Sequence, residues 1–516
     1  MKKWKQWLSG LMACVLLCTL TAVPCRAVSV KFRDVPAGHW AASYITQAAE
    51  IGLVRGQTAD TFGLGRPMTR AAFTVILCRL FGWEMLRPEK GSFTDVQDPA
   101  LWYYSAVETA CSNGAVTRQT STFRPNAPIT REEMAVMLIR ALGYSSVAGL
   151  DQGLPCPFQD VDSNKGYLTM AYYLGISGGT SASTFSPDQT ATREQAVSML
   201  MRVYRCWHER APERIGIAGS FDLASVSGCT AVALSSARLL PNNTVAPITA
   251  SDKEIQTFRE KLKASNARVL LQVSGNQSSL QQLNAADSAK AIAAEAVGYD
   301  GILLDIEKLD SSVKTSYTAL VRKLRSLMGT EKLLYLVAEA PLSGSAAGGY
   351  DYAALSALAD RLILRTAPYD KEVNGFPAVP QEPLEEVYYA FASLKNQVDP
   401  SKCSLWLSTT GLTWTGDRPS GSTMAPQIHS ALENPAADVY YSARYADAYL
   451  ILMEKAAGKN VRTVIWYHNN QAVSARVRLC AFFGADSVCL SNLASVADYP
   501  DYSITEALSG SILPSA

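Results

Sequence analysis

The sequence predicts a multi-domain protein in which all-α repeats are followed by an α/β barrel of the (β/α)8 type. Three observations support this fold class. The chain has 516 residues, which is more than one ordinary domain needs. Residues 30–207 contain the same short pattern three times, at intervals of 61 and 62 residues. From residue 213 on, strand-like and helix-like runs alternate over about 290 residues.

The composition limits the possible classes of function. The formal net charge is +1, 48% of the residues are hydrophobic and 18% are charged. A near-neutral chain lacks the basic face or tail that nucleic-acid binding normally requires. The apolar fraction argues against long disordered regions. We therefore expect globular domains and no nucleic-acid partner.

Residues 1–27 have the three parts of a secretory signal peptide. Lys2, Lys3 and Lys5 form a basic start, an apolar run follows at 8–23, and a small residue, Ala27, ends the segment. The alternative is a membrane anchor, but the run is shorter than the ~20 residues that a span needs. Cleavage leaves 43 basic and 46 acidic residues. We predict a secreted protein with no membrane span after cleavage.

The cysteines are scattered and contain no Cys-x-x-Cys pair. Outside the signal segment they are Cys78, Cys111, Cys156, Cys206, Cys229, Cys403, Cys480 and Cys489. Their isolated positions in apolar runs are typical of buried small hydrophobic residues. The four histidines lack metal-ligand spacing. We predict no metal and no cofactor.

Each repeat contains the same signals in the same order. It opens with Phe-x-Asp-Val, continues with an aromatic residue and a helix-ending glycine, then has a loop phenylalanine, and closes with Thr-Arg. The residues are Phe32–Val35, Phe93–Val96 and Phe158–Val161; Trp40, Trp102 and Tyr167; Gly52, Gly114 and Gly175; Phe62, Phe123 and Phe185; and Thr69-Arg70, Thr130-Arg131 and Thr192-Arg193.

The Thr-Arg pairs carry helix-start signals. Thr130 with Glu133 has the pattern of a capping box, and Thr192 with Gln195 repeats it, whereas Thr69 lacks such a partner. Apolar residues then recur at helical spacing. The aspartate of each opening Phe-x-Asp-Val segment is expected to cap the first helix of its repeat, which precedes the helix that starts at Thr-Arg. Each repeat is then two helices joined by a polar loop, and the three pack together because one alone cannot bury its apolar stripe.

These repeats resemble S-layer homology (SLH) domains, in the opening F-x-D-V and the closing T-R-E pattern. The three repeats span residues 30–87, 90–150 and 155–207. The resemblance implies a helical module that binds a cell-wall polysaccharide of a Gram-positive-type envelope, with Arg70, Arg131 and Arg193 near grooves for an anionic polymer. A guanidinium fork suits a carboxylate or phosphate on such a polymer. The alternative is that these arginines only complement surface charge at helix starts.

Alternating elements in the C-terminal part predict a parallel sheet covered by helices. Strand-like runs occur at 215–218, 231–234, 269–273, 302–306, 333–338, 362–364, 404–407, 464–467 and 487–490, and helical patterns at 249–264, 285–296 and 311–327. A (β/α)8 barrel over residues 213–505 accommodates this pattern. The alternative is an open Rossmann sheet, but no G-x-G-x-x-G motif opens a helix here.

The sharpest local feature is the apolar run that ends in Asp305-Ile306-Glu307. A strand alternates its faces, so Leu303, Asp305 and Glu307 share one face, which points inward in a barrel. Two carboxylates at the carboxyl end of an apolar strand are costly unless they are used. Barrel enzymes keep their chemistry at this end, and close like charges raise one pKa, which suits a general acid. The alternative is a strand-end salt bridge or a helix cap.

This stretch resembles the D-G-x-x-x-D-x-E signature of glycoside hydrolase family 18, the chitinases and their relatives. In particular it resembles the branch that contains spore-cortex and peptidoglycan N-acetylglucosaminidases. Ala367-Pro368-Tyr369-Asp370 is similar to the family's M-x-Y-D motif. Trp466-Tyr467-His468-Asn469 is similar to the W-F-E-D layout of the spore-type branch. The resemblance covers about residues 213–500.

The resemblance implies a retaining, substrate-assisted hydrolysis. Glu307 would protonate the glycosidic oxygen, and Asp305 would orient the 2-acetamido group, whose carbonyl attacks the anomeric carbon. Tyr369 would hydrogen-bond that group and Asp370 would support the reacting sugar. Their alternatives are an ordinary strand-end aromatic and a turn or cap. Trp414 would stack on the sugar or, alternatively, fill the core.

Three departures from the family pattern are visible. Leu303 stands where chitinases have a third carboxylate, Leu490 where the last strand usually offers a tryptophan, and His468 with Asn469 in place of an acidic pair. We predict a cell-wall-anchored glycosidase for β-linked N-acetylglucosamine polymers, with peptidoglycan first and chitin-type or N-glycan chains next. The alternatives are a non-catalytic sugar-binding protein and a structural S-layer component that displays the barrel.

Overall fold

The computed structural model describes residues 31–150, 154–208, 212–219, 228–247, 252–264, 266–341, 348–366, 379–456, 459–500 and 502–509. They form two compact units. One contains the residues up to Arg66 with Thr192–Ser198, and the other contains Pro67–Ala191 with the residues from Met199 on. The predicted signal peptide lies outside the described residues. Among the described helices, none has the length and apolar character to cross a membrane.

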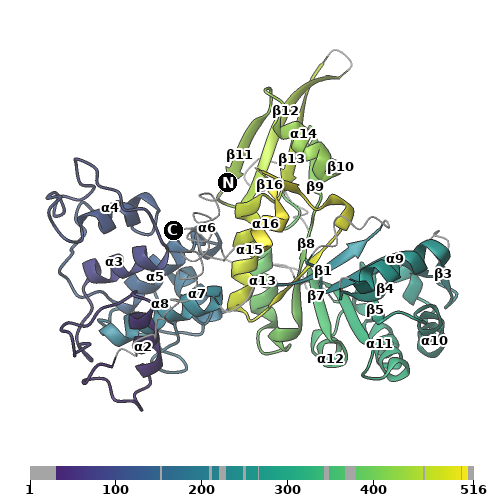
Figure 1. Cartoon of the computed structure of the whole chain (residues 1–516), viewed down its shortest axis with the longest axis horizontal. Coiled ribbons are helices and arrows are strands. Elements are labelled where there is room, and N and C mark those ends of the chain that lie inside the picture. Colours follow the sequence, from purple (N-terminus) through teal and green to yellow (C-terminus); the bar gives the residue numbers. More distant parts are fainter. Residues whose placement is uncertain are drawn as a thin grey trace, which may run out of the picture. The chain divides into compact units, whose positions relative to one another are not determined.

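The N-terminal part is helical, as predicted (Figure 1). Its helices are α2 (Ala42–Glu50), α3 (Arg70–Leu80), α4 (Tyr104–Ser112), α5 (Arg131–Ala141), α6 (Ser145–Ala148), α7 (Lys165–Tyr173) and α8 (Arg193–His208). Arg70, Arg131 and Arg193 are the first residues of α3, α5 and α8. The Thr-Arg pairs therefore mark helix starts, as the sequence predicts.

The predicted caps form to different extents. Thr130 and Glu133 make the complete capping box at α5. At α8 only half of it forms, because the Thr192 N–H donates to Gln195 Oε1 at 3.1 Å while the Thr192 hydroxyl has no partner among the described residues. Thr69 caps α3 without a reciprocal side chain.

The prediction that Asp34, Asp95 and Asp160 cap the first helices is wrong. Each aspartate lies at least five residues before its helix begins, too far for an N-cap. Both carboxylate oxygens instead accept backbone N–H bonds at 2.7 Å from the loop that carries the repeat's phenylalanine. The donors are Phe62 and Gly63, Phe123 and Arg124, and Phe185 and Ser186. The repeated aspartate therefore closes the loop of its own repeat.

A ring of three backbone hydrogen bonds joins the segments just before the Thr-Arg pairs. The Ile129 N–H donates to the Met68 carbonyl at 2.8 Å, Ala191 to Ile129 at 2.9 Å, and Met68 to Ala191 at 2.9 Å. All three residues lie in the second unit. This ring satisfies a donor and an acceptor of each segment and brings the repeats together at a shared point.

The C-terminal part contains a closed parallel barrel, as predicted (Figure 1). Its strands are β1 (Glu213–Ala218), β2 (Ala231–Leu239), β4 (Arg268–Asn276), β5 (Gly301–Glu307), β6 (Leu333–Glu339), β7 (Arg361–Arg365), β8 (Cys403–Leu407) and β14 (Ser487–Leu490). They pair in the order β1-β14-β8-β7-β6-β5-β4-β2, and the β1–β2 pairing closes the ring. This closure excludes the open Rossmann sheet. The short β3 (Val245–Pro247) pairs antiparallel with β2.

Helices follow most barrel strands, as the alternating pattern predicts. They are α9 (Asp252–Ala264), α10 (Ala285–Glu295), α11 (Lys314–Met328), α12 (Tyr352–Leu358), α13 (Leu384–Leu394), α15 (Asn470–Phe482) and α16 (Ile504–Ser509).

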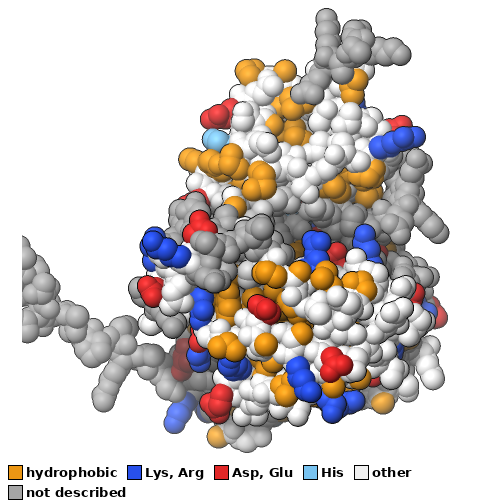
Figure 2. Space-filling view, turned by 90° about the vertical axis from the view of Figure 1, so that its right-hand side faces the viewer, with side chains coloured by type: hydrophobic (Ala, Val, Ile, Leu, Met, Phe, Trp, Pro, Cys, Tyr) orange, Lys and Arg blue, Asp and Glu red, His pale blue; other side chains and the backbone are white. Residues whose placement is uncertain are grey.

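On the face shown in Figure 2, basic and acidic side chains are interspersed over the lower part. This mixture agrees with the near-neutral composition.

The run at 464–467 is a strand but lies outside the barrel, in a five-stranded antiparallel sheet inserted between β8 and β14. Its elements are β9 (Gly411–Thr415), β10 (Arg418–Thr423), α14 (Ala425–Leu432), β11 (Asp438–Ser442), β12 (Asp447–Ala456) and β13 (Lys459–Tyr467). The order is β10-β9-β13-β12-β11. Periodicity alone does not separate a short apolar strand of this sheet from a barrel strand.

The barrel interior is packed by the inward side chains of its strands. The cluster comprises Ile215, Ile217, Ala231, Ala233, Leu270, Leu303, Tyr335, Val337, Ile363 and Cys489, with Leu333 and Trp406 against it. Leu303 therefore faces inward, as predicted from the alternation of β5. Below this cluster, Arg361 forms ion pairs with Glu213 and Asp486.

None of the eight cysteines in the described part of the chain forms a disulfide. Cys78, Cys229, Cys403, Cys480 and Cys489 are buried, as predicted. The prediction is wrong for Cys111, Cys156 and Cys206, which are partly exposed at the surface of the helical part.

Candidate active site

The carboxyl end of β5 brings the two predicted carboxylates to the inner face of the barrel. Asp305 is paired in register with Ser274 on β4 and Val337 on β6. It lies two residues above the buried Leu303, and Glu307 follows two residues later at the end of the strand. The Asp305 side chain is 7% exposed and that of Glu307 is 46% exposed. The acids thus differ strongly in their access to solvent.

Arg365, the last residue of β7, joins the two carboxylates and is not among the residues predicted for the site. Its Nη2 donates to Asp305 Oδ1 at 2.8 Å and to Oδ2 at 2.7 Å. Its Nη1 donates to Glu307 Oε1 at 2.7 Å. Such charge-assisted bonds are short and roughly twice as strong as neutral ones. One guanidinium therefore holds both acids.

Two further side chains complete this cluster. The Arg365 guanidinium carbon lies 4.1 Å from the ring centroid of Trp406 on β8, a cation–π contact. Gln272 on β4 donates through Nε2 to Asp305 Oδ2 at 3.2 Å. Arg365 Nε and Gln272 Oε1 have no hydrogen-bond partner among the described residues. The cluster therefore contains one buried donor and one buried acceptor that no described residue satisfies.

Burial and charge act against each other at this site. Burial raises the pKa of Asp305, and Arg365 and Gln272 oppose that rise. Burial alone would lower the pKa of Arg365, but the charges of Asp305 and Glu307 outweigh it and raise that pKa. The guanidinium is therefore a permanent cation between the two acids.

The sequence does contain a signal for Arg365. Arg361, Ile363 and Arg365 alternate with Leu362 and Leu364, and Ile363 lies in the barrel core. The strand therefore directs both arginines inward, one at each end. A charged residue at the carboxyl end of an apolar strand is the same pattern that singles out Asp305.

Of the three predicted substrate-binding residues, the structure describes Trp414 alone. Tyr369 and Asp370 lie outside the described residues. Trp414 is 9% exposed, belongs to the core of the inserted sheet and donates through Nε1 to the Val379 carbonyl at 3.1 Å. These contacts agree with the alternative that Trp414 fills the core. Its role in stacking on the sugar stays a prediction. Leu490 is buried on β14.

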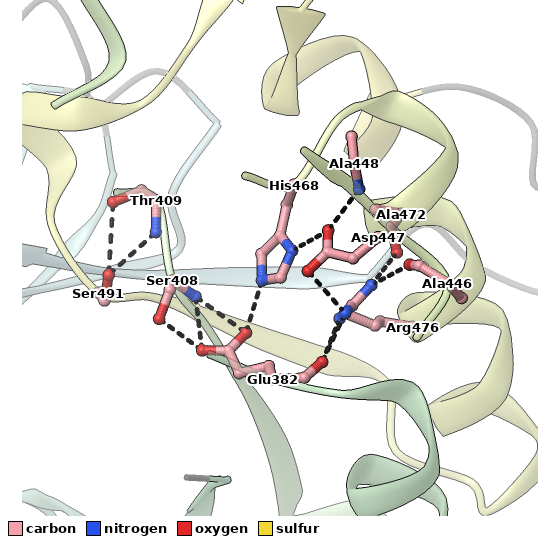
Figure 3. A network of polar contacts seen from close by, with 10 residues as sticks. All are labelled: Glu382, Ser408, Thr409, Ala446, Asp447, Ala448, His468, Ala472, Arg476 and Ser491. Carbon is pink, nitrogen blue, oxygen red and sulfur yellow. Dashed lines mark hydrogen bonds and ion pairs between the residues drawn. The ribbon is translucent and has the colours of Figure 1, made fainter. Parts of the chain in front are cut away.

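His468 lies in a second, fully buried polar network (Figure 3). Its Nδ1 is 2.9 Å from Asp447 Oδ1, and its Nε2 is 2.9 Å from Glu382 Oε2. Arg476 Nη2 is 3.2 Å from Asp447 Oδ2, and the Ser408 N–H donates to Glu382 at 3.0 Å. The network links the inserted sheet, α15 and the end of β8, which gives His468 a structural role.

The charges in this network favour a protonated imidazole. Burial would lower the pKa of His468, but Asp447 and Glu382 outweigh burial and raise it. Burial would raise the pKa of Glu382, but hydrogen bonds from His468 and Ser408 outweigh burial and lower it. Two carboxylates and two cations then balance inside the protein.

The three arginines of the repeats each contact the loop phenylalanine of another repeat. Their Nε atoms donate to the carbonyls of these residues at 2.9 or 3.0 Å, and their guanidinium carbons lie 4.8–5.0 Å from the ring centroids. The pairs are Arg70 with Phe123, Arg131 with Phe185, and Arg193 with Phe62. Each arginine therefore joins two repeats.

Arg70 also lies at a groove of about 210 Å³ in the second unit. Arg124, Arg140 and Glu133 line the same groove, and Arg70 Nη1 is 2.9 Å from Glu133 Oε1. Arg131 is buried, and its Nη2 donates to the Gly178 carbonyl at 2.7 Å. The structure thus gives Arg70 access to a cavity and Arg131 a packing role, and a wall-polymer role for all three arginines stays a prediction.

Comparisons with known proteins identify both parts of the chain. The family model described as "Glycosyl hydrolases family 18" matches residues 202–481. The model of the S-layer homology domain matches residues 31–74, 92–135 and 157–197.

Curated relatives share part of the sequence. An endoglucanase of Bacillus sp. (strain KSM-635) is 29% identical over 252 residues, which are 44% of this chain and 26% of that protein. An S-layer protein of Bacillus thuringiensis subsp. finitimus is 27% identical over 203 residues, 39% of this chain and 24% of that protein. The chain thus spans about a quarter of the length of these curated relatives.

Solved structures share part of the chain at low identity. The C-terminal domain of a putative chitinase from Desulfitobacterium hafniense DCB-2 has a TM-score of 0.49 and 17% identity, over 56% of this chain and 95% of that one. The spore cortex-lytic enzyme SleL of Bacillus cereus has a TM-score of 0.46 and 15% identity, over 55% and 72%.

Proposed function

The chain belongs to glycosyl hydrolase family 18 and carries three S-layer homology domains, and from this we propose that it is a cell-surface glycosidase acting on β-linked N-acetylglucosamine polymers. Peptidoglycan is the first candidate substrate, and chitin-type or N-glycan chains come next. The observation that carries the proposal is the pair Asp305 and Glu307 at the carboxyl end of a closed barrel. Barrel enzymes hold their catalytic groups at this end.

In the proposed reaction, Glu307 transfers its proton to the glycosidic oxygen while the bond from that oxygen to the anomeric carbon breaks. The carbonyl oxygen of the sugar's own 2-acetamido group bonds to the anomeric carbon, and the Asp305 carboxylate stabilises the positive charge that develops. Water then attacks the anomeric carbon, the bond from that carbon to the acetamido oxygen breaks so that the open acetamido group is restored, and the water gives one proton to the Glu307 carboxylate. We assign Tyr369 to the acetamido group and Asp370 to the reacting sugar by resemblance.

The repeats supply the anchor in this proposal. Residues 1–27 direct export, residues 30–207 attach the protein to the wall of a Gram-positive-type bacterium, and residues 213–505 act on the glycan. Attachment keeps the barrel at a high local concentration of wall glycan. A modest affinity of the barrel for its substrate is then sufficient.

A substrate panel tests this proposal. The mature chain is incubated with muropeptide chains, chitooligosaccharides and N-glycans, and new reducing ends are measured. The proposal expects cleavage of at least one of these polymers at a bond that follows an N-acetylglucosamine unit. Binding without cleavage of any of them contradicts the glycosidase proposal.

A second candidate is a non-catalytic sugar-binding or structural surface protein. Two observations favour it. Leu303 is fully buried where chitinases have a third carboxylate, and Arg365 is hydrogen-bonded to both Asp305 and Glu307. Equilibrium binding separates the two forms of this candidate, because a sugar-binding protein retains the oligosaccharides and a purely structural protein does not.

A further inference from the structure

Arg365 divides its hydrogen bonds unequally between the two acids. Asp305 accepts two of them and is almost fully buried, whereas Glu307 accepts one and is about half exposed. A buried charge needs its partner, because an unpaired charge in a low dielectric is strongly unfavourable. An exposed ion pair contributes little, since solvent replaces the lost contact. The contact with Glu307 is therefore the one that breaks more easily.

The proposed chemistry requires that contact to break. A general acid must hold a proton on its carboxyl group. The ion pair with Arg365, in contrast, requires Glu307 to be a carboxylate. The two states exclude each other, so Glu307 acts as the acid only when it is released from the guanidinium.

Arg365 has contacts that do not depend on Glu307. The face of Trp406 supports the guanidinium, and Asp305 holds Nη2 through both oxygens. Glu307 ends β5, and Lys308 after it has a φ of 56°, so the strand does not continue past the acid.

We propose that Arg365 is the positioning residue of this site, which stays paired with Asp305 and keeps it a carboxylate while it releases Glu307 to act as the acid. The inference rests on the function proposed above. It adds a residue to the site that the family resemblance does not contain.

Asp305 depends on Arg365 for its charge. Among the described residues, the titratable groups that act on it or feel its charge are Arg365 from β7, Glu307 from its own strand, Tyr317 from α11 and Cys489 from β14. Of these, Arg365 provides the positive charge. Burial already raises the pKa of Asp305, so loss of the guanidinium raises that pKa further.

The pH dependence of kcat/KM tests the proposal, because it reports the ionisations of the free enzyme. The low-pH side of the kcat/KM profile (its acid limb) follows the ionisation of Asp305. In Arg365→Met this acid limb is expected to move at least one pH unit higher, and in Arg365→Lys it moves back toward the wild-type position. Arg361→Met is the matched control. Arg361 also points inward from β7, and its side chain, like that of Arg365, is 16% exposed and pairs with two acids. A lower rate in Arg365→Met with an unmoved acid limb overturns the proposal.

A stability measurement decides the inference even if no polymer is cleaved. Arg365→Met, Asp305→Asn and the double variant are melted at pH 5 and pH 8. Asp305 in Arg365→Met has a pKa above its unfolded value, so this variant loses stability as the pH rises. Its melting temperature should fall further below wild type at pH 8 than at pH 5, and Asp305→Asn should restore most of the difference. The proposal is contradicted if Arg365→Met lowers the melting temperature equally at pH 5 and pH 8 and if its effect adds to that of Asp305→Asn in the double variant. Absence of turnover in wild type contradicts the proposed function alone.

Discussion

Replacement of His468 by leucine tests the buried network most severely. The imidazole is buried and bonds Glu382 and Asp447 at 2.9 Å each. Leucine leaves these two carboxylates with Arg476 as the remaining cation of the network. Removal of one partner from a buried charge pair costs about 3–5 kcal/mol. We therefore expect the free energy of unfolding to fall by about that amount.

The sign of the pH dependence follows from the raised pKa of His468. A raised folded-state pKa gives stability that is fully present below the unfolded value and is lost as the pH rises through the folded value. The difference between wild type and His468→Leu should therefore be larger at pH 6 than at high pH. Urea unfolding at several pH values measures it.

His429 provides the control for this substitution. Its contact with Glu433, the residue that follows α14, lies at the surface, with side chains 32% and 70% exposed, and even a full ion pair at such a place contributes about 0–1 kcal/mol. His429→Leu should therefore change stability little. The double variant His468→Leu/Glu382→Gln should recover part of the loss, because it removes one uncompensated charge. A loss in His468→Leu no larger than in His429→Leu would refute the reasoning.

Two predictions concern the repeats. Asp95→Asn removes one of the two carboxylate acceptors of the loop amides and should lower the free energy of unfolding by about 0.5–1.5 kcal/mol in urea titrations. A loss equal to that of Asp98→Asn, whose likewise exposed carboxylate accepts the local Ala100 N–H, would contradict it. Arg70→Ala removes a guanidinium from the groove and should reduce co-sedimentation of the mature chain with purified cell walls about tenfold, whereas Arg33→Ala, 74% exposed, should not. Unchanged sedimentation of Arg70→Ala would exclude Arg70 from wall binding.

Local patterns predicted the elements that depend on neighbouring residues. The capping box at Thr130 and the inward face of β5 follow from spacings of two or three residues, and both are present. The aspartates of the opening segments were misassigned because their partners lie 25 to 29 residues away, beyond any helix-cap spacing.

Long-range pairing explains what the sequence did not reveal about the site. Arg365 meets Asp305 and Glu307 across 60 and 58 residues of chain, through the neighbouring positions of β5, β6 and β7 in the sheet. The pattern marked Arg365 as inward-facing but not as the partner of both acids. His468 likewise finds Glu382 across 86 residues, and only the folded inserted sheet brings the two together.

The most direct test of the central claim is the turnover of a bound oligosaccharide by Glu307→Gln. General acid catalysis contributes about 10²–10⁴-fold, so kcat should fall by at least about 100-fold in this variant while the Kd for the oligosaccharide stays close to wild type. Glu339→Gln is the control, because Glu339 ends the adjacent β6 and accepts a bond from the Lys308 N–H. Comparable kcat values for wild type and Glu307→Gln would contradict the assignment of Glu307 as the acid.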